Sequence, residues 1–242
     1  MPLPKNLNKA IPDRFVVWAP RDMVGGDMYW CRPWGDGHIV ILGDCTGHGV
    51  PGAFMTLISN GALGQAYREI EPGKPGLLLQ RIHQIIQAAL GQHLDEGASD
   101  DGLELGICYI SSKRDSMIFA GARFDLFVLD GESLSVIKGI KKGTGYRGIP
   151  HDQNYLETEV ELRPGQRFYM TSDGIIDQVG GEKRRGFGKR KFKELLLESR
   201  NKSLEYQKDI LLKALEEHQG SERRRDDVSI IGFSLSEEAI LN

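Results

Sequence analysis

The sequence predicts an α+β domain in which antiparallel strands form layers with two groups of helices. Short runs of β-branched and aromatic residues, bounded by Gly, Pro and Asp, recur along most of the chain, which is typical of hairpin-connected strands. Helical periodicity is confined to two places, and each has room for a pair of helices. Helices gathered in this way favour a layered antiparallel architecture over a regular alternation of strands and helices.

The first part of the chain is expected to contain three strands and then two helices. The strands are predicted at residues 15–19, 27–31 and 38–42. From residue 50 the apolar residues change to helical spacing, and Pro51 suits the first helical turn. This first stripe consists of Val50, Phe54, Leu57, Ile58 and Ala62. A second apolar stripe at residues 78–89 predicts the second helix.

Strand patterns then return, and a second pair of helices precedes a final strand. Five strands are predicted at residues 103–110, 117–120, 126–129, 134–137 and 167–171. Residues 189–199 and 204–218 have helical patterns, and the apolar run at residues 228–235 predicts the last strand.

Composition excludes several classes of protein. Hydrophobic residues make up 40% and charged residues 27% of the 242 residues, so the chain is not wholly disordered. A net charge of −3 gives no global field that would attract nucleic acid, and no basic motif is interleaved with aromatic residues. Three widely spaced cysteines exclude a disulfide framework and a zinc cage, and they favour a reducing compartment. No apolar run approaches the roughly 20 residues of a membrane span, so we expect a cytoplasmic domain.

The two ends of the chain are expected to lie outside the folded domain. The start, MPLPKNLNKAIPD, is polar and rich in proline, so residues 1–13 are predicted to be a linker. Residues 14–236 are predicted to form the domain, and residues 237–242 a C-terminal tail. A linker at the start indicates that the chain is one domain of a longer protein.

Four short motifs place an aspartate at the edge of an apolar strand, beside glycine or another acid. They are VGGD (24–27), GDCTGHG (43–49), TSDG (171–174) and DDVS (226–229). Carboxylates that met at strand ends would repel one another, and a divalent cation would remove that cost. A set of oxygen ligands suits Mg²⁺ or Mn²⁺ better than Zn²⁺. A single Asp-Gly pair is more often a turn than a ligand, so spacing alone leaves both interpretations open.

Together the four motifs resemble the metal-dependent protein phosphatase (PPM) family, and more closely its SpoIIE/RsbU-type bacterial serine phosphatase branch. The resemblance extends from about Phe15 to Leu235. It implies a four-layer α-β-β-α sandwich of two antiparallel sheets flanked by helical pairs. It also implies a protein serine/threonine phosphatase with a pair of Mn²⁺ or Mg²⁺ ions, in which a metal-bridging hydroxide attacks phosphoserine or phosphothreonine.

The resemblance assigns roles to single residues through their places in the motifs. Asp44 would bridge both ions, and the backbone carbonyl of Cys45 would hold one of them. Asp27 would serve the same ion as Cys45, directly or through water. Asp173 and Asp226 would hold the other ion. Asp44 and Asp173 are the expected catalytic residues, acting through the bridging water.

The resemblance also implies one further metal site, and it shows a position at which this chain differs from many relatives. Asp177 lies where some relatives bind a weaker third ion, with an acid near Asp100–Asp101 as another ligand. Many relatives have a histidine after Ala-Gly, where this chain has Ala122–Arg123. Any family role of that histidine is therefore in doubt here.

Three other features have both a functional and a structural interpretation. Arg21 could grip the substrate phosphate through its planar fork, or form a surface salt bridge with Asp22 or Asp13. His48 could act as a general acid, or hold the tight GHG turn. The basic segment at residues 183–193 could be a flap that steers an acidic phosphoprotein, or a solvated surface.

The resemblance further implies a phosphorylated anti-sigma-factor-antagonist-type protein as substrate. Members of this branch often form homodimers or are switched by upstream helices, and the parent chain is expected to carry an upstream sensor or membrane region, as in a membrane-anchored receptor-type phosphatase. Two alternatives remain open from the sequence. One is a non-catalytic phosphoprotein-binding module of the same fold, and the other is a phosphohydrolase of small molecules such as nucleotides.

Overall fold

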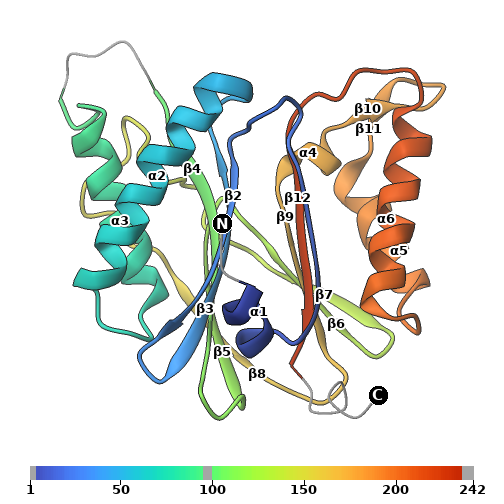
Figure 1. Ribbon diagram of the computed structural model, residues 1–242, viewed down its shortest axis with the longest axis horizontal. Coiled ribbons are helices and arrows are strands. Elements are labelled where there is room, and N and C mark those ends of the chain that lie inside the picture. The colour runs from blue at the N-terminus through green and yellow to red at the C-terminus, as the bar shows by residue number, and fades with distance from the viewer. Residues whose placement is uncertain (1–3, 95–99, 236–242) are drawn as a thin grey trace.

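Two five-stranded antiparallel sheets stand face to face in the computed structural model, which describes residues 4–94 and 100–235 (Figure 1). Every strand pair within the two large sheets is antiparallel. In spatial order, the first sheet consists of β1 (Asp13–Ala19), β12 (Val228–Ser234), β9 (Arg167–Thr171), β6 (Leu126–Asp130) and β7 (Ser133–Ile137). The second sheet consists of β2 (Asp27–Trp34), β3 (Gly37–Cys45), β4 (Leu103–Ile110), β5 (Ser116–Ala122) and β8 (Glu157–Glu161).

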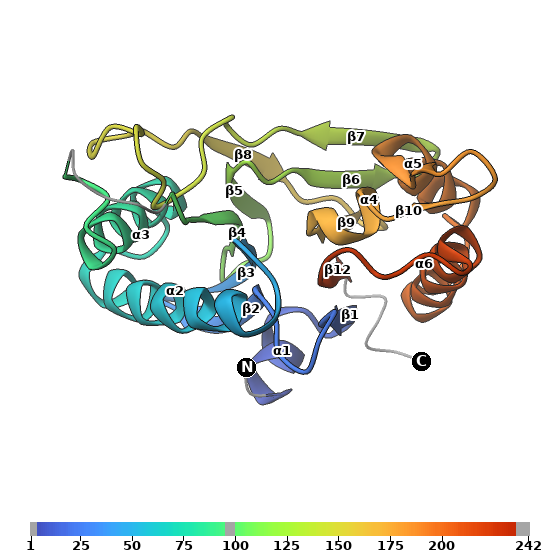
Figure 2. The ribbon, with the colours of Figure 1, turned by 90° about the horizontal axis from the view of Figure 1, so that it is seen from above.

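Helical pairs form the outer layers, as the view from above shows (Figure 2). The second sheet is covered by α2 (Gly49–Glu69) and α3 (Pro75–Ala89), and the first by α5 (Gly188–Glu198) and α6 (Leu204–Gln219). Three short elements complete the described chain: α4 (Asp173–Ile176), and the small hairpin of β10 (Val179–Gly180) and β11 (Arg185–Gly186). The predicted α+β class and the four-layer sandwich are confirmed.

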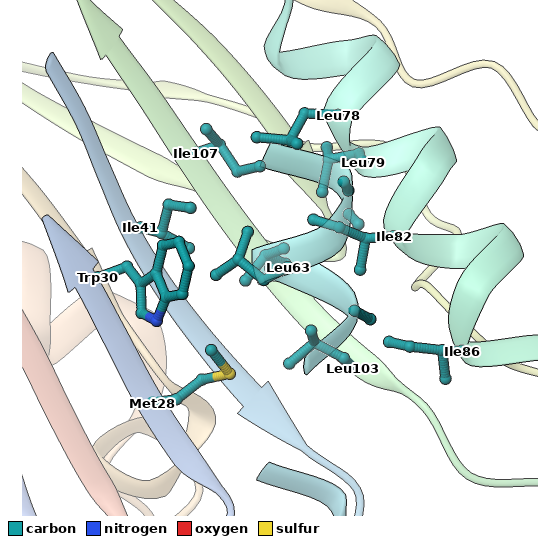
Figure 3. Packing of buried hydrophobic residues seen from close by; sticks show 14 of the residues in the cluster. Met28, Trp30, Ile41, Leu63, Leu78, Leu79, Ile82, Ile86, Leu103 and Ile107 are labelled. Carbon is teal, nitrogen blue, oxygen red and sulfur yellow. The ribbon is translucent and has the colours of Figure 1, made fainter. Parts of the chain in front are cut away.

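The hydrophobic core has one layer at each of the three interfaces. Side chains of α2 and α3 pack on the second sheet, where Leu63 lies near Ile41 and Ile107 (Figure 3). A second cluster fills the space between the sheets and includes Phe168 and Phe233. The third lies between the first sheet and α5 and α6. Each large sheet is therefore apolar on both faces, which explains the near-continuous apolar runs in the central strands.

The N-terminal segment differs from the predicted linker. Residues Pro4–Ala10 form a helix, α1, that packs on β2. Leu7, Ala10 and Ile11 are buried in the cluster between the sheets, and their i, i+3, i+4 spacing gives the short helix an apolar face. The described part of segment 1–13 is thus packed on the domain. The predicted C-terminal tail, residues 237–242, lies outside the described residues.

The apolar stripe that predicted α2 is only partly buried: Ala62 lies in the core and Ile58 packs against it, whereas the other three residues do not. Val50, Phe54 and Leu57 are exposed. The buried face of α2 consists mostly of small residues, namely Gly49, Gly52, Met55, Ser59, Ala62, Leu63 and Ala66. Small side chains on that face let the helix backbone lie close to the loops that carry the first two aspartate motifs, as the hydrogen bonds of Thr56 described below show.

Candidate active site

The register of the second sheet places three acidic residues in one row. Asp27, the first residue of β2, lies directly opposite Asp44 in β3. Asp44 in turn lies opposite Glu104 in β4. Side chains of directly paired residues share one face of an antiparallel sheet, and like charges in such pairs are unfavourable. The sequence motifs predicted the two aspartates but gave no sign of Glu104.

The adjacent ends of β9 and β12 in the first sheet carry the other two motifs. Thr171 of β9 pairs with Ile230 of β12, so Ser172 and Asp173 follow at the same edge where Asp226 precedes β12. Ser172 is the N-cap of the short helix α4, and Asp173 is its first residue. These positions bring the TSDG and DDVS motifs side by side.

A direct hydrogen bond joins the two sheets at this edge. The hydroxyl of Ser172 donates to Oδ2 of Asp27 at 2.8 Å. Ser172 Oγ also accepts the backbone N–H of Ser229 at 3.0 Å. Ser172, Ser229 and Asp27 are all buried. The third motif therefore holds the carboxylate of the first motif in place, although the two lie 145 residues apart in sequence.

Asp227 fixes the loop that leads into β2. Its carboxylate accepts the backbone N–H of Gly26 at 2.5 Å and that of Arg21 at 2.7 Å. A Cβ on Gly25 would meet this carboxylate, and one on Gly26 would meet the carbonyl oxygens of Gly47 and Cys45. The two glycines of VGGD are therefore required for close packing. The DDVS motif points to Asp226 as a ligand, whereas the structural role of its neighbour Asp227 is visible only in the fold.

The first turns of α2 lie against the same loop. The hydroxyl of Thr56 donates to the carbonyl oxygens of Gly25 and Gly26, at 3.1 and 3.0 Å. A Cβ on Gly52 would meet the carbonyl oxygen of Gly47 and, at 3.0 Å, the backbone nitrogen of Gly26. The VGGD and GDCTGHG motifs and the start of α2 thus form one close backbone junction.

Burial and mutual repulsion raise the pKa values of the predicted aspartates. Burial raises the pKa of Asp27 to about 7, the hydrogen bond from Ser172 opposes this rise, and the charges of Asp227 and Asp226 add to it. Burial also raises the pKa of Asp44 well above its usual value, and Asp27 is the largest of several carboxylates that add to that rise.

The pKa of Asp173 is also raised, first by burial and then by the charges of Asp226 and Asp177. The charge of Asp226 thus contributes to the raised pKa values of Asp27, Asp44 and Asp173 alike. The edge of the sandwich holds an excess of negative charge.

The donor set at this edge fits a hard divalent cation. Oδ1 of Asp27 is buried and has no hydrogen-bond partner, although its other oxygen is bonded to Ser172. A buried carboxylate oxygen without a partner is costly, and a cation would satisfy it. Within residues 4–94 and 100–235, no group of three or more His, Cys, Asp and Glu is already arranged around one metal position. The oxygen donors suit Mg²⁺ or Mn²⁺ chemically.

Cys45 offers no thiolate to such a centre. Its side chain is buried, and burial raises the pKa of its thiol to about 12. Its Sγ lies 3.4 Å from the hydroxyl oxygen of Ser59 on α2, away from the row of carboxylates. The protonated thiol is neither a nucleophile nor a metal ligand, which leaves the backbone carbonyl as the group that Cys45 can contribute.

The guanidinium of Arg21 is engaged with its neighbours. Its Nη1 donates to the carbonyl oxygen of Arg225 at 2.9 Å and lies 2.5 Å from Nε2 of His48. A guanidinium only donates, so Nε2 accepts and the ring proton of neutral His48 is on Nδ1, which lies 3.3 Å from Asp22. This tautomer favours the structural interpretation of His48. Asp22 is also 4.0 Å from Nε of Arg21.

A cavity of about 190 Å³ adjoins Asp173. Its charged lining residues are Glu104, Arg123, Asp125, Asp173, Asp177 and Lys189. Asp177 thus lines the same cavity as Asp173, and its role as a ligand of a further ion stays a prediction. Asp100 and Asp101 do not line the cavity: the carboxylate of Asp100 accepts the backbone N–H of Arg147, and the backbone of Asp101 is bonded to Gln92.

The basic segment at residues 183–193 reaches this cavity through one residue. Nζ of Lys189, in the first turn of α5, lies 2.8 Å from Asp125. Arg184, at the turn of the β10–β11 hairpin, instead forms an ion pair with Glu222 at 2.9 Å. The segment therefore borders the site only at the start of α5.

Comparisons with known proteins identify the family. The family model of stage II sporulation protein E (SpoIIE) matches residues 35–236. The SiaA-PP2C domain of Pseudomonas aeruginosa is 33% identical, with a TM-score of 0.83, and the match covers 96% of this chain and 90% of that one. A comparison with curated protein sequences gives no match.

Two more distant structures share the fold. The PP2C phosphatase domain of SpoIIE from Bacillus subtilis, solved with a fragment of its regulatory domain, is 16% identical with a TM-score of 0.70, covering 92% of this chain and 63% of that one. The RsbU and RsbW domains of Rv1364c from Mycobacterium tuberculosis are 16% identical with a TM-score of 0.67, covering 93% and 60%.

The sandwich and its acidic edge define a PP2C-type phosphatase fold. The chain belongs to the SpoIIE family, and it is a protein serine/threonine phosphatase domain. The predicted membership of the PPM family and of its SpoIIE/RsbU-type branch is confirmed. Among the described residues, no helix is both long enough and apolar enough to cross a membrane.

Proposed function

We propose that this domain is a Mn²⁺- or Mg²⁺-dependent phosphatase that dephosphorylates phosphoserine or phosphothreonine on a regulatory protein. The observation that carries the proposal is the convergence of Asp27, Asp44, Asp173 and Asp226 at one edge of the sandwich. Together they give a set of oxygen donors that includes the buried and unpartnered Oδ1 of Asp27. A bound cation would compensate the cost of burying that oxygen. The family of the chain, which consists of phosphatases, supports the same conclusion.

The geometry supports a division of labour among the ligands. Asp44 lies opposite Asp27 in the second sheet, and the charges of Asp173 and Asp226 at the edge of the first sheet also raise its pKa, so it is the proposed bridge between two ions. Asp27 and the carbonyl of Cys45 are proposed to hold one ion, and Asp173 and Asp226 the other. When bound, such a pair of ions supplies a nucleophilic water of lowered pKa and neutralises charge on the phosphoryl group.

Other residues of this chain position the ligands. Ser172 donates to Asp27, so it orients the other oxygen of that carboxylate toward the site. Asp227 holds the backbone of the loop before Asp27 through its two N–H bonds. Asp177, beside Asp173 in the cavity, is proposed as a ligand of a weaker third ion. A role of Arg21 in binding substrate stays a prediction. In the structure its Nη1 donates to the carbonyl oxygen of Arg225 and lies close to His48.

The proposed substrate is a phosphorylated protein of the anti-sigma-factor-antagonist type. Support comes from structural neighbours, since one contains linked RsbU and RsbW domains and another is described as part of the bacterial stressosome. We also propose that the domain works on the cytoplasmic side of the cell, within a longer receptor-type chain. Homodimer formation and a membrane anchor stay predictions.

The test compares wild type with Asp44→Ala and Asp173→Ala on p-nitrophenyl phosphate and on phosphoproteins from the same cell, with Mn²⁺ and with EDTA. Asp36→Asn is the matched control, because Asp36 is an exposed acid at the opposite end of the same β2–β3 hairpin. We expect Mn²⁺-dependent phosphate release by wild type and the control only. Phosphoprotein binding without turnover by wild type would favour the non-catalytic module, and turnover by either alanine variant would refute the assigned site.

A further inference from the structure

Arginine closes the row of acidic residues across the second sheet. The pairing of Leu105 with Ala122 places Glu104 of β4 beside Arg123, the residue that follows β5. Nη1 of Arg123 lies 3.2 Å from Oε1 of Glu104. The row from Asp27 through Asp44 to Glu104 therefore ends in a fixed positive charge.

The backbone of Arg123 adopts a conformation that favours glycine. Its φ is +56°, and its N–H donates to the carbonyl oxygen of Ile140 at 2.8 Å. A side chain at positive φ crowds the backbone, so a residue other than glycine is strained there. Such strain concentrates at functional sites, and it is a reason to ask what the arginine side chain does.

The side chain of Arg123 is available to a ligand. It is 51% exposed and lines the cavity beside Asp173. A guanidinium has five N–H donors in a planar fork, and Glu104 uses only part of them. Lys189, the other cation of the cavity, lies 2.8 Å from Asp125, whose carboxylate also lies 2.8 Å from Lys138. Arg123 is thus the cation of this cavity that is best placed to take an anion.

We propose that the guanidinium of Arg123 binds the phosphoryl group of the substrate while Glu104 orients it. This inference rests on the proposed function, because the phosphoryl group must lie beside the carboxylates of Asp44 and Asp173 for the reaction to occur there. A planar fork beside these carboxylates matches two oxygens of one phosphoryl group. Arg21, which the sequence suggested for this task, directs its Nη1 to Arg225 and His48 and does not line this cavity.

The test is Arg123→Gly, with Arg114→Gly as the matched control. Arg114 has the same φ of +56° but lies in the β4–β5 turn, at the other end of the seven-residue strand β5. Glycine relieves the same backbone strain at both positions, and each variant loses one side-chain contact, to Glu104 or to the carbonyl oxygen of Lys9, so we expect similar melting temperatures for the two variants. The measurements are KM and kcat for p-nitrophenyl phosphate, Ki for inorganic phosphate, and Mn²⁺ binding by calorimetry.

For Arg123→Gly we expect KM and the Ki of inorganic phosphate to rise by about tenfold or more, the loss that a charge-assisted hydrogen bond represents. We expect Mn²⁺ affinity to stay within about threefold of wild type, and Arg114→Gly to match wild type throughout. An unchanged Ki would overturn the inference while leaving the phosphatase assignment intact. Loss of Mn²⁺ binding would also overturn it, because Arg123 would then serve to balance the charge of the neighbouring carboxylates and not to bind the phosphoryl group. An inactive wild type would instead count against the proposed function.

Discussion

Replacing Asp27 by asparagine should stabilise the metal-free domain at alkaline pH while it removes the proposed metal site. Asp27 is 3% exposed, and its pKa rises from 3.8 to about 7, mainly because of burial. In the unfolded chain the carboxyl ionises near its usual pKa, whereas in the fold it holds its proton to near neutrality. The fold therefore binds more protons between these two values, and its stability falls as pH rises through that window.

The size of the effect follows from the same pKa values. Each pH unit within the window costs about 1.4 kcal/mol, so wild type should lose about 3 kcal/mol between pH 5 and pH 8 through Asp27, with no further loss above pH 7. Asparagine cannot ionise, yet its carbonyl oxygen can still accept the hydroxyl of Ser172. The gain of Asp27→Asn over wild type should thus be about 3 kcal/mol larger at pH 8 than at pH 5.

The assay is urea unfolding in EDTA at pH 5, 6, 7 and 8. Asp36→Asn is the control, because the pKa of Asp36 is lowered by hydrogen bonds from Tyr109 and Ser112. Ionised Asp36 therefore stabilises the fold at every pH above the usual carboxyl pKa. Its contribution to the free energy of unfolding does not change between pH 5 and pH 8. A free-energy difference between Asp27→Asn and wild type that is the same at all four pH values would refute the reasoning.

Three further outcomes are expected. Mn²⁺ should raise the melting temperature of wild type more at pH 8 than at pH 5, because protons compete for the same carboxylates; equal shifts in a calorimetric scan would contradict this. Asp227→Ala should lower the free energy of unfolding by about 3 kcal/mol, since the backbone N–H groups of Arg21 and Gly26 lose a charged acceptor. Unchanged stability in urea unfolding would show that Asp227 does not hold this loop. Gly52→Ala should destabilise by about 1–3 kcal/mol through backbone overlap, whereas Gly61→Ala, which meets nothing within 4 Å on the same helix, should be neutral or stabilising. Urea unfolding of both variants checks this pair, and equal effects would contradict it.

Much of the fold could be predicted because its core strands carry unambiguous patterns. β3 and β4 are almost continuously buried, so their apolar runs identify them. The edge strand β8 has the sequence ETEVE and is mostly exposed, so no apolar pattern marks it. Helix α1 was missed because its three buried residues lie within a polar segment that is rich in proline.

The candidate site was predicted through motifs, and what was missed depends on contacts between distant segments. Glu104 lies in an apolar strand, and only its pairing with Asp44 reveals that it belongs to the acidic row. Asp227 and Asp226 are adjacent acids, and only the fold shows that Asp227 accepts the backbone N–H groups of the loop before β2. For Arg123, the positive φ and the proximity to Glu104 are likewise visible only in three dimensions.

The most direct test of the metal site is anomalous diffraction at the manganese edge from crystals of the Mn²⁺-loaded domain. We expect two peaks about 3.5–4 Å apart, bridged by Asp44, with Asp27 beside one and Asp173 beside the other. Manganese bound only elsewhere on the surface, or Asp44 turned away from both peaks, would contradict a dinuclear centre at this edge of the sandwich.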